Sequence, residues 1–379
     1  MPWQEVSVMD RRREFVDFAK ADGANLSLLC RQFGISRKTG YKWLARYQTE
    51  EPISKGLSDR SRRPRHSPGQ TTSETEQAIL KVRDAHPAWG GRKIAHCLKR
   101  DGVEPPAIST VHAILTRHGR ISAQGHAGKA FGKFERAAPN ELWQMDFKGQ
   151  ERLGNGDWCY PLTVIDDHSR FSLCLEACDN QQTPTVKALL EQTFRRYGLP
   201  AAFYVDNGSP WGGAAQGRWT PLTVWLLKLN IGVIYATPYC PQGRGKNERF
   251  HRSLKAEVFA AKALPDKQHA QRAFDAWRHT YNHERPHESL AMASPVSRYS
   301  PSPRQMPRHL PIVEYDSSDI LRKVCMTEPR IAFRNQYWRV PRAFKGETVA
   351  VRPIDDDSYG IYFGATKIAK IDLKTSKKM

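Results

Sequence analysis

The chain has 379 residues, which is too long for one ordinary hydrophobic core and predicts three or four modules. Its 59 Lys and Arg against 39 Asp and Glu give a formal net charge of +20, which favours a polyanionic partner, usually nucleic acid. The seven cysteines are scattered and form no C-x-x-C pair, so neither a disulfide framework nor a zinc finger is indicated. With no transmembrane-length apolar run and no signal peptide, we expect a cytoplasmic, nucleoid-associated protein that contacts no membrane.

Residues 1–50 are predicted to form an all-α helix-turn-helix domain. Apolar residues recur at helical spacing in three stretches, and Ser36 is a good N-cap for a basic third helix that follows a glycine turn. Three cations of that helix are expected to face the DNA groove: Arg37, Lys38 and Lys42. A plain three-helix bundle is the alternative interpretation.

A basic linker and a second helical module follow. Residues 51–70 contain Pro-flanked arginines suited to a narrow minor groove, and a solvated tether is the alternative. These arginines are Arg60, Arg62, Arg63 and Arg65. Residues 71–120 repeat the helical pattern and predict a second helix-turn-helix domain, with a capping box at Ser73 and Glu76. Another basic linker covers residues 121–138.

Residues 139–297 alternate strands and helices and predict an α/β core with a mixed five-stranded sheet. Asp146 lies in the middle of the first strand on its polar side, and Asp206 ends a later strand. Glu248 lies in the helix after the last strand. Carboxylates from these three elements can converge at one edge of the sheet. They suit Mg²⁺, and two such ions stabilise the attacking and leaving oxygens of a phosphoryl displacement.

The helix around Glu248 carries that acid on an otherwise cationic face. At about 100° per residue, His251, Arg252 and Lys255 fall within about 60° of Glu248. A carboxylate in such a setting suits a metal ion held beside a polyanion. We therefore expect three cations of this region to bind DNA: Lys246, Arg252 and Lys255.

The adjacent acids Asp166 and Asp167 are a second candidate for the site. They follow a strand-like run and precede His168-Ser-Arg, so a hairpin turn whose Asp side chain bonds local backbone is the preferred interpretation. A second possibility is that Asp167 orients the site without binding the metal itself.

The C-terminal part divides into a Pro-rich linker, residues 298–317, and residues 318–379. The latter contain five short strand-like runs, which predict a small SH3-like β-barrel. Two roles are possible for this barrel: contact with DNA, and dimerisation or a purely structural role.

The three acids also carry a family resemblance. LWQMDFKG around Asp146, YVDNGS around Asp206 and GKNERFHRSLKAE around Glu248 resemble the D,D,E signature of DDE transposases and retroviral-type integrases. YNHERPHESL resembles the segment after the core in bacterial insertion-sequence transposases. The resemblance implies an RNase H-like fold and catalysis by two Mg²⁺, with Mn²⁺ as a plausible substitute. It implies that the three acids are the catalytic metal ligands and that Lys255 contacts terminal DNA.

The resemblance implies a DNA transposase that cleaves insertion-sequence ends and joins them to target DNA. Such an enzyme acts on double-stranded DNA as a homo-oligomer, a dimer or larger. Two departures from the retroviral pattern stand out: 41 residues separate Asp206 from Glu248, and the His-His-Cys-Cys module is missing. The alternatives are a phage or retroelement integrase, or a catalytically silent DNA-binding regulator.

Overall fold

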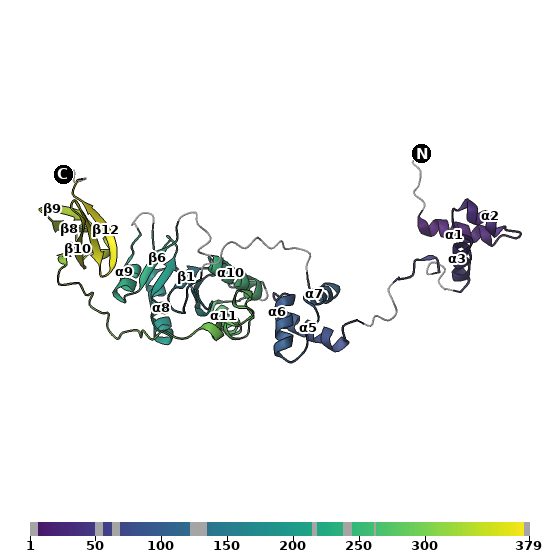
Figure 1. Ribbon diagram of the computed structural model, residues 1–379, viewed down its shortest axis with the longest axis horizontal. Helices are drawn as coiled ribbons and strands as arrows, with labels where there is room; N and C mark the ends of the chain where they lie inside the picture. The colour runs from purple at the N-terminus through teal and green to yellow at the C-terminus, as the bar shows by residue number, and fades with distance from the viewer. Residues whose placement is uncertain are drawn as a thin grey trace. The chain divides into compact units, whose positions relative to one another are not determined.

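The computed structural model describes residues 7–49, 56–62, 69–121, 135–213, 218–237, 245–260 and 263–374 (Figure 1). The chain divides into two compact units, Met1–Gln70 and Thr71–Met379, and each is described by itself. Within the described ranges, no helix is both long enough and apolar enough to cross a membrane.

The first unit contains three helices, as predicted: α1 (Val8–Ala19), α2 (Leu26–Gln32) and α3 (Arg37–Thr49). Gly34 makes the turn before α3 at a φ of 65°, a left-handed conformation that glycine adopts without strain. Ser36 accepts a hydrogen bond from the Thr39 amide and so begins the third helix. Leu57, from within the expected linker, joins the small core around Trp43.

The second unit begins with another three helices: α5 (Ser73–Ala85), α6 (Gly91–Arg100) and α7 (Ile108–Arg117). The capping box predicted at Ser73 is wrong. Thr72 has the extended backbone of an N-cap and accepts a hydrogen bond from the Thr75 amide, so Ser73 is already helical. Glu76 instead pairs with Arg117 of α7 and ties two helices together.

A mixed sheet follows, as predicted. Its strands are β1 (Trp143–Phe147), β2 (Glu151–Arg152), β3 (Trp158–Asp166), β4 (Ser172–Cys178), β5 (Ala202–Val205) and β6 (Gly232–Tyr235). β3 pairs antiparallel with β1 and β4, whereas β1, β5 and β6 run parallel. The two-residue β2 extends the five predicted strands to six.

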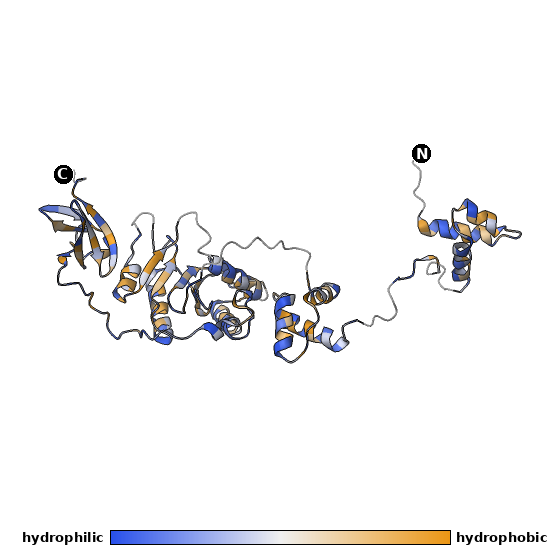
Figure 2. Ribbon diagram, in the orientation of Figure 1, coloured by the Kyte–Doolittle hydropathy of each residue, from blue (hydrophilic) through white to orange (hydrophobic). Residues whose placement is uncertain are grey.

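Helices cover both faces of this sheet. The helices are α8 (Thr183–Tyr197), α9 (Pro221–Lys228), α10 (Gly245–Leu254) and α11 (Lys267–His283). Trp143 and Met145 of β1 pack with α8 and α9, while α10 and α11 pack with Ile165 and Leu175 of the neighbouring strands. In Figure 2, α9 and the nearby strands are largely hydrophobic, whereas α10 is largely hydrophilic.

The start of the expected Pro-rich linker packs on the core. It follows two short helical turns, η3 (Glu288–Leu290) and η4 (Pro295–Arg298). The Tyr299 ring stacks on Phe171 with centroids 4.2 Å apart, and Arg304 donates to the carbonyl of Pro200 at 2.7 Å. These residues therefore belong structurally to the core rather than to a free tether.

The C-terminal strands form two small antiparallel sheets. They are β7 (Ile320–Lys323), β8 (Arg330–Phe333), β9 (Gln336–Arg339), β10 (Thr348–Asp355), β11 (Ser358–Phe363) and β12 (Thr366–Asp372), with the turn η5 (Arg342–Phe344) between β9 and β10. The order β12-β11-β10-β7 makes one sheet, and β8 and β9 pair only with each other. The predicted closed SH3-like barrel is not confirmed, because no described backbone pairing joins the hairpin to the sheet.

Candidate active site

Asp146 lies near the end of β1, and Asp206 directly follows β5, the parallel neighbour of β1. β1 and β5 are parallel, and their register places Gln144 opposite Tyr204. Continued two residues further, just past the end of β5 at Val205, this register would bring Asp146 level with Asp206. Two carboxylates separated by 59 intervening residues of sequence therefore reach the same end of the sheet.

The residues that precede the two aspartates show how the strands face. Met145 and Val205, the residues just before them, both pack in the core formed with α8 and α9. Since successive side chains of a strand point to opposite faces, Asp146 is directed to the α10 side, whereas Asp206 directly follows the end of β5. The sheet thus presents the Asp146 carboxylate to the helix that carries Glu248.

The Asp206 carboxylate is held by its own loop. Its Oδ1 accepts a hydrogen bond from the Gly208 amide at 2.8 Å and one from the Trp211 indole at 2.5 Å. Trp211 is buried and stacks on Phe147 of β1 with centroids 5.6 Å apart. The indole therefore connects Asp206 to the strand that carries Asp146.

Glu248 lies on the exposed first turn of α10. His251 lies one turn further along α10. Its Nε2 is 2.9 Å from the Thr163 hydroxyl, which donates its proton to the carbonyl of Asp146. Because the hydroxyl has one proton and gives it to that carbonyl, His251 Nε2 must be the donor in the other bond. α10 is thereby fixed to the strand pair directly behind Asp146.

The helix changes character after Leu254. A π-helical segment, η2 (Lys255–Phe259), follows α10, and such segments occur often at functional sites. Glu257 of η2 lies on the buried side, where its Oε1 accepts from Arg285 at 2.7 Å and its Oε2 accepts from Trp277 at 2.8 Å. Arg252 and Lys255 are exposed, so both are available for the DNA contacts predicted from the sequence.

The acid pair after β3 has a structural arrangement. Asp166 accepts from the Ser169 amide and hydroxyl and from the Asn140 amide, which confirms the predicted turn with local backbone bonds. Burial raises the pKa of Asp166, and the bonds from Ser169 counteract that shift. Asp167 is fully buried and pairs with the ammonium of Lys246.

The ammonium of Lys246 is committed to this pair. Its side chain is 15% exposed, burial lowers its pKa, and the hydrogen bond to Asp167 opposes that shift. The described partner of this predicted DNA contact is therefore an internal carboxylate.

The other predicted DNA contacts lie in the first unit. Arg37, Lys38 and Lys42 are exposed on α3, and Lys42 Nζ lies 4.6 Å from the centroid of the neighbouring Trp43 ring. Arg60 and Arg62 are exposed as well. Arg63 and Arg65 lie outside the described residues.

The donor chemistry fits a hard cation such as Mg²⁺, which takes carboxylate oxygens. The three acids predicted from the sequence, Asp146, Asp206 and Glu248, all carry such oxygens. Within the described ranges, no three His, Cys, Asp or Glu side chains lie close enough together to hold a metal ion. The structure places Asp146 in β1, Asp206 directly after the parallel strand β5, and Glu248 on an exposed turn of α10.

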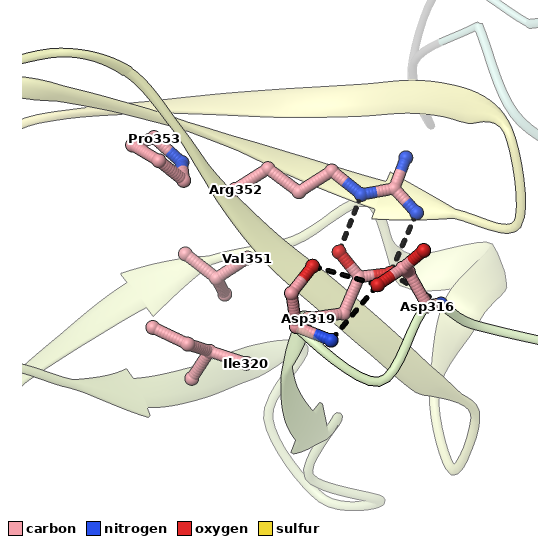
Figure 3. Close-up of a pocket in the computed structure, with 7 residues that line it drawn as sticks. Asp316, Asp319, Ile320, Val351, Arg352 and Pro353 are labelled. Carbon is pink, nitrogen blue, oxygen red and sulfur yellow. Dashed lines mark hydrogen bonds and ion pairs between the residues drawn. The ribbon is translucent and has the colours of Figure 1, made fainter.

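A pocket of about 530 Å³ lies elsewhere, in the C-terminal sheet. Figure 3 shows Arg352 of β10 reaching Asp319 through two hydrogen bonds, of 2.6 and 2.7 Å. Asp316 and Ile320 line the same hollow. None of the three candidate acids borders it, so it does not belong to the candidate active site.

Several contacts that shape the site were not predicted from the sequence. They are the bonds of Trp211 to Asp206, of His251 to Thr163, and of Arg285 to Glu257. The sequence offered one signal: His251 falls on the Glu248 face, and an imidazole there needs a partner. Trp211 lies five residues after Asp206 in the same loop, whereas Arg285 and Glu257 are 28 residues apart and no local pattern specifies their pairing.

Models of known domains match most of the chain. A helix-turn-helix domain matches residues 11–65 and a homeodomain-like domain matches residues 39–115. Integrase core domains match residues 136–241 and 229–295, and the C-terminal domain of IS481 family transposases matches residues 319–379. The expected likeness to insertion-sequence proteins with an integrase-like core is confirmed, as is a helix-turn-helix N-terminal part.

Relatives from bacterial mobile elements match shorter stretches. An uncharacterized 31.7 kDa protein of insertion element IS407 from Burkholderia multivorans is 29% identical, over 42% of this chain and 54% of that protein. An uncharacterized 39.2 kDa protein of IS476 from Xanthomonas euvesicatoria is 25% identical, over 61% of this chain and 67% of that protein. The transposase for transposon Tn552 of Staphylococcus aureus is 23% identical, over 61% and 52%. The chain thus spans about half to two thirds of the relatives' length.

A solved structure overlaps more weakly. The catalytic core domain of HTLV-2 integrase in complex with magnesium aligns with 43% of this chain and 99% of its own at 13% identity and a TM-score of 0.34. An overlap at this level carries no argument about this chain.

Proposed function

We propose that this chain is an insertion-sequence transposase, as its integrase core and IS481-type C-terminal domain indicate, and that it cleaves element ends and joins them to target DNA. The observation that carries the proposal is the parallel register of β1 and β5, which supports a paired role for Asp146 and Asp206 at one end of the sheet. That arrangement suits phosphoryl transfer, which needs no nucleophilic side chain because water or a DNA 3′-hydroxyl attacks.

Asp146, Asp206 and Glu248 would hold two Mg²⁺ ions, with Mn²⁺ as a substitute. When bound, such ions stabilise the attacking and leaving oxygens of an in-line displacement. The chain's own residues prepare this site. Trp211 and Gly208 fix the direction of the Asp206 carboxylate, and His251 fixes α10 to the carbonyl of Asp146 through a threonine.

DNA would be held by cations outside the metal site. Arg252 and Lys255 are exposed on the helix that carries Glu248 and can bind the phosphates of the element end. The helix-turn-helix part would recognise the end sequence, with α3 in the major groove. Because an element has two ends, a dimer or larger assembly on double-stranded DNA is required.

The test compares the wild type with Asp206→Asn on a linear duplex carrying the DNA that flanks this gene. The wild type should cut and join these ends in Mg²⁺ or Mn²⁺. The variant should bind the same duplex with unchanged affinity and lose at least about a thousand-fold in joining rate, because several kcal/mol of charge stabilisation is removed.

Two outcomes contradict the proposal. Joining by Asp206→Asn at the wild-type rate would show that this aspartate is not part of the catalytic site. A wild type that binds the duplex and never joins it, in either metal, would favour a DNA-binding regulator with a silent core.

A further inference from the structure

Asp167 is the fully buried acid that faces the beginning of α10. Its Oδ1 accepts from the Gln144 side chain at 2.7 Å and from the Lys246 ammonium, and its Oδ2 accepts from the Arg136 amide at 2.8 Å. The Lys246 ammonium also donates to the Asp167 carbonyl at 3.2 Å. One carboxylate therefore holds β1, α10 and the segment that enters the core.

Two partners of Asp167 each lie two residues before a candidate ligand in the sequence. Gln144 lies two residues before Asp146 on the same side of β1, and Lys246 lies two residues before Glu248. Breaking the Lys246 contact would free the first turn of α10, whereas the His251 contact holds the next turn. The carboxylate thus joins the strand that carries Asp146 to the first turn of the helix that carries Glu248.

We propose that the buried Asp167–Lys246 pair is a positioning device that fixes Glu248 against Asp146 and so sets the metal affinity of the site. The inference rests on the proposed function and deepens it. Neither residue is a metal ligand or a DNA contact in this proposal: both act through the helix and the strand that they join.

The same helix offers a matched control. Glu257 and Arg285 form another buried ion pair, with side chains 9% and 7% exposed, at the far end of the α10–η2 segment. If burial of an ion pair merely stabilises the fold, breaking either pair should have the same consequences. If Asp167 positions Glu248, only the pair beside Glu248 should change the metal requirement.

The variants are Lys246→Met, Asp167→Asn and Lys246→Arg, with Arg285→Met as the control, all in the full chain. Both disrupting variants should raise the Mn²⁺ concentration for half-maximal joining by about 10- to 100-fold, the usual effect of losing a residue that orients a ligand. Lys246→Arg keeps the charge and should stay near the wild type. Arg285→Met should melt at a lower temperature and keep the wild-type Mn²⁺ requirement.

Because Lys246 and Asp167 carry opposite charges, their two variants distinguish a positioning role from a DNA contact. If Lys246 bound phosphates, Lys246→Met would weaken metal-free binding of the flanking duplex, and Asp167→Asn would release the ammonium and strengthen it. Positioning instead predicts that both variants bind this duplex like the wild type and lose metal affinity together. Opposite shifts in duplex binding would overturn the inference.

Mn²⁺ binding to the DNA-free protein, measured by calorimetry, keeps the test independent of joining. A wild type that binds Mn²⁺ without joining ends would contradict the proposed function, and weaker Mn²⁺ binding in both variants would still support the positioning role. Unchanged Mn²⁺ binding in both variants, or an equal change in Arg285→Met, would overturn it. A wild type that neither binds Mn²⁺ nor joins ends would overturn both the proposed function and the positioning role.

Discussion

The two faces of the core sheet differ in what they bury. The face covered by α8 and α9 is packed with aromatic and aliphatic side chains, among them Trp143, Phe194 and Trp225. The face covered by α10 and α11 also has an apolar core, but it adds buried charges, Asp167 with Lys246 and Glu257 with Arg285. Apolar contacts tolerate small shifts, whereas a buried ion pair is stable only in one geometry.

This difference indicates a division of labour within one sheet. The apolar face supplies stability through the area that it removes from water. The other face buries charged side chains as well, and the bonds of Asp167 fix α10 relative to β1. A region that must hold two carboxylates close together needs such fixed partners, because like charges repel.

The largest effect should come from Glu248→Gln on the charged face. Joining should fall at least about a thousand-fold, because a proposed metal ligand loses its charge. Stability should change by less than about 0.5 kcal/mol, because Glu248 is exposed. Joining assays and thermal melting measure the two quantities, and exposed Glu314→Gln serves as the control. Normal joining by Glu248→Gln would remove this residue from the site.

The apolar face should respond in the opposite way. Phe194→Ala removes a fully buried ring from α8 and should cost about 3–5 kcal/mol of unfolding free energy. The molecules that remain folded should keep the wild-type metal requirement for joining. Denaturant unfolding measures the cost, and the neighbouring Arg195→Ala, an exposed position, should change little. A shift in metal requirement would contradict the separation of the two faces.

Arg285→Met tests a buried charge away from the proposed ligands. It leaves the Glu257 carboxylate buried with a single indole donor and should cost about 3–5 kcal/mol. The exposed pair of Lys267 with Asp179 provides the control, and Lys267→Met should cost at most about 1 kcal/mol. Equal losses in the two variants, measured by chemical unfolding, would show that burial of the pair is unimportant.

The smallest effect is a pH dependence from His287. Burial, with Arg285 adding to it, lowers the pKa of His287 to about 3, so the folded chain keeps this imidazole neutral. In the unfolded chain, the His287 imidazole binds a proton near pH 6.5. Its contribution to the free energy of unfolding is therefore present above that pH and is lost as the pH falls toward 3. Between pH 7 and pH 5 the loss should be about 2 kcal/mol.

Unfolding at both pH values measures this loss. His287→Phe should flatten the dependence, because the phenyl ring cannot take up a proton. His112→Gln, at an exposed position on α7, should leave it unchanged. An unaltered slope in His287→Phe would assign the pH dependence to other groups.

Much of the fold could be predicted from local pattern. The glycine turn and Ser36 cap placed the third helix, and alternation in WQMDFK placed Asp146 on the polar side of its strand. Errors arose where neighbouring positions compete or where strands must close. The N-cap is Thr72, one residue before the predicted Ser73. The C-terminal strands pair into a four-stranded sheet and a hairpin, and a closed barrel is not confirmed.

The sequence by itself determined which residues could do chemistry: three acids in distinctive contexts and a cationic helix face around one of them. The fold was needed to show that β1 and β5 are parallel neighbours, with Gln144 opposite Tyr204. It also decided that the Lys246 ammonium has Asp167 as its partner. The physical reason is that periodicity acts over a few residues, whereas strand register and the pairing of buried charges join segments far apart in the chain.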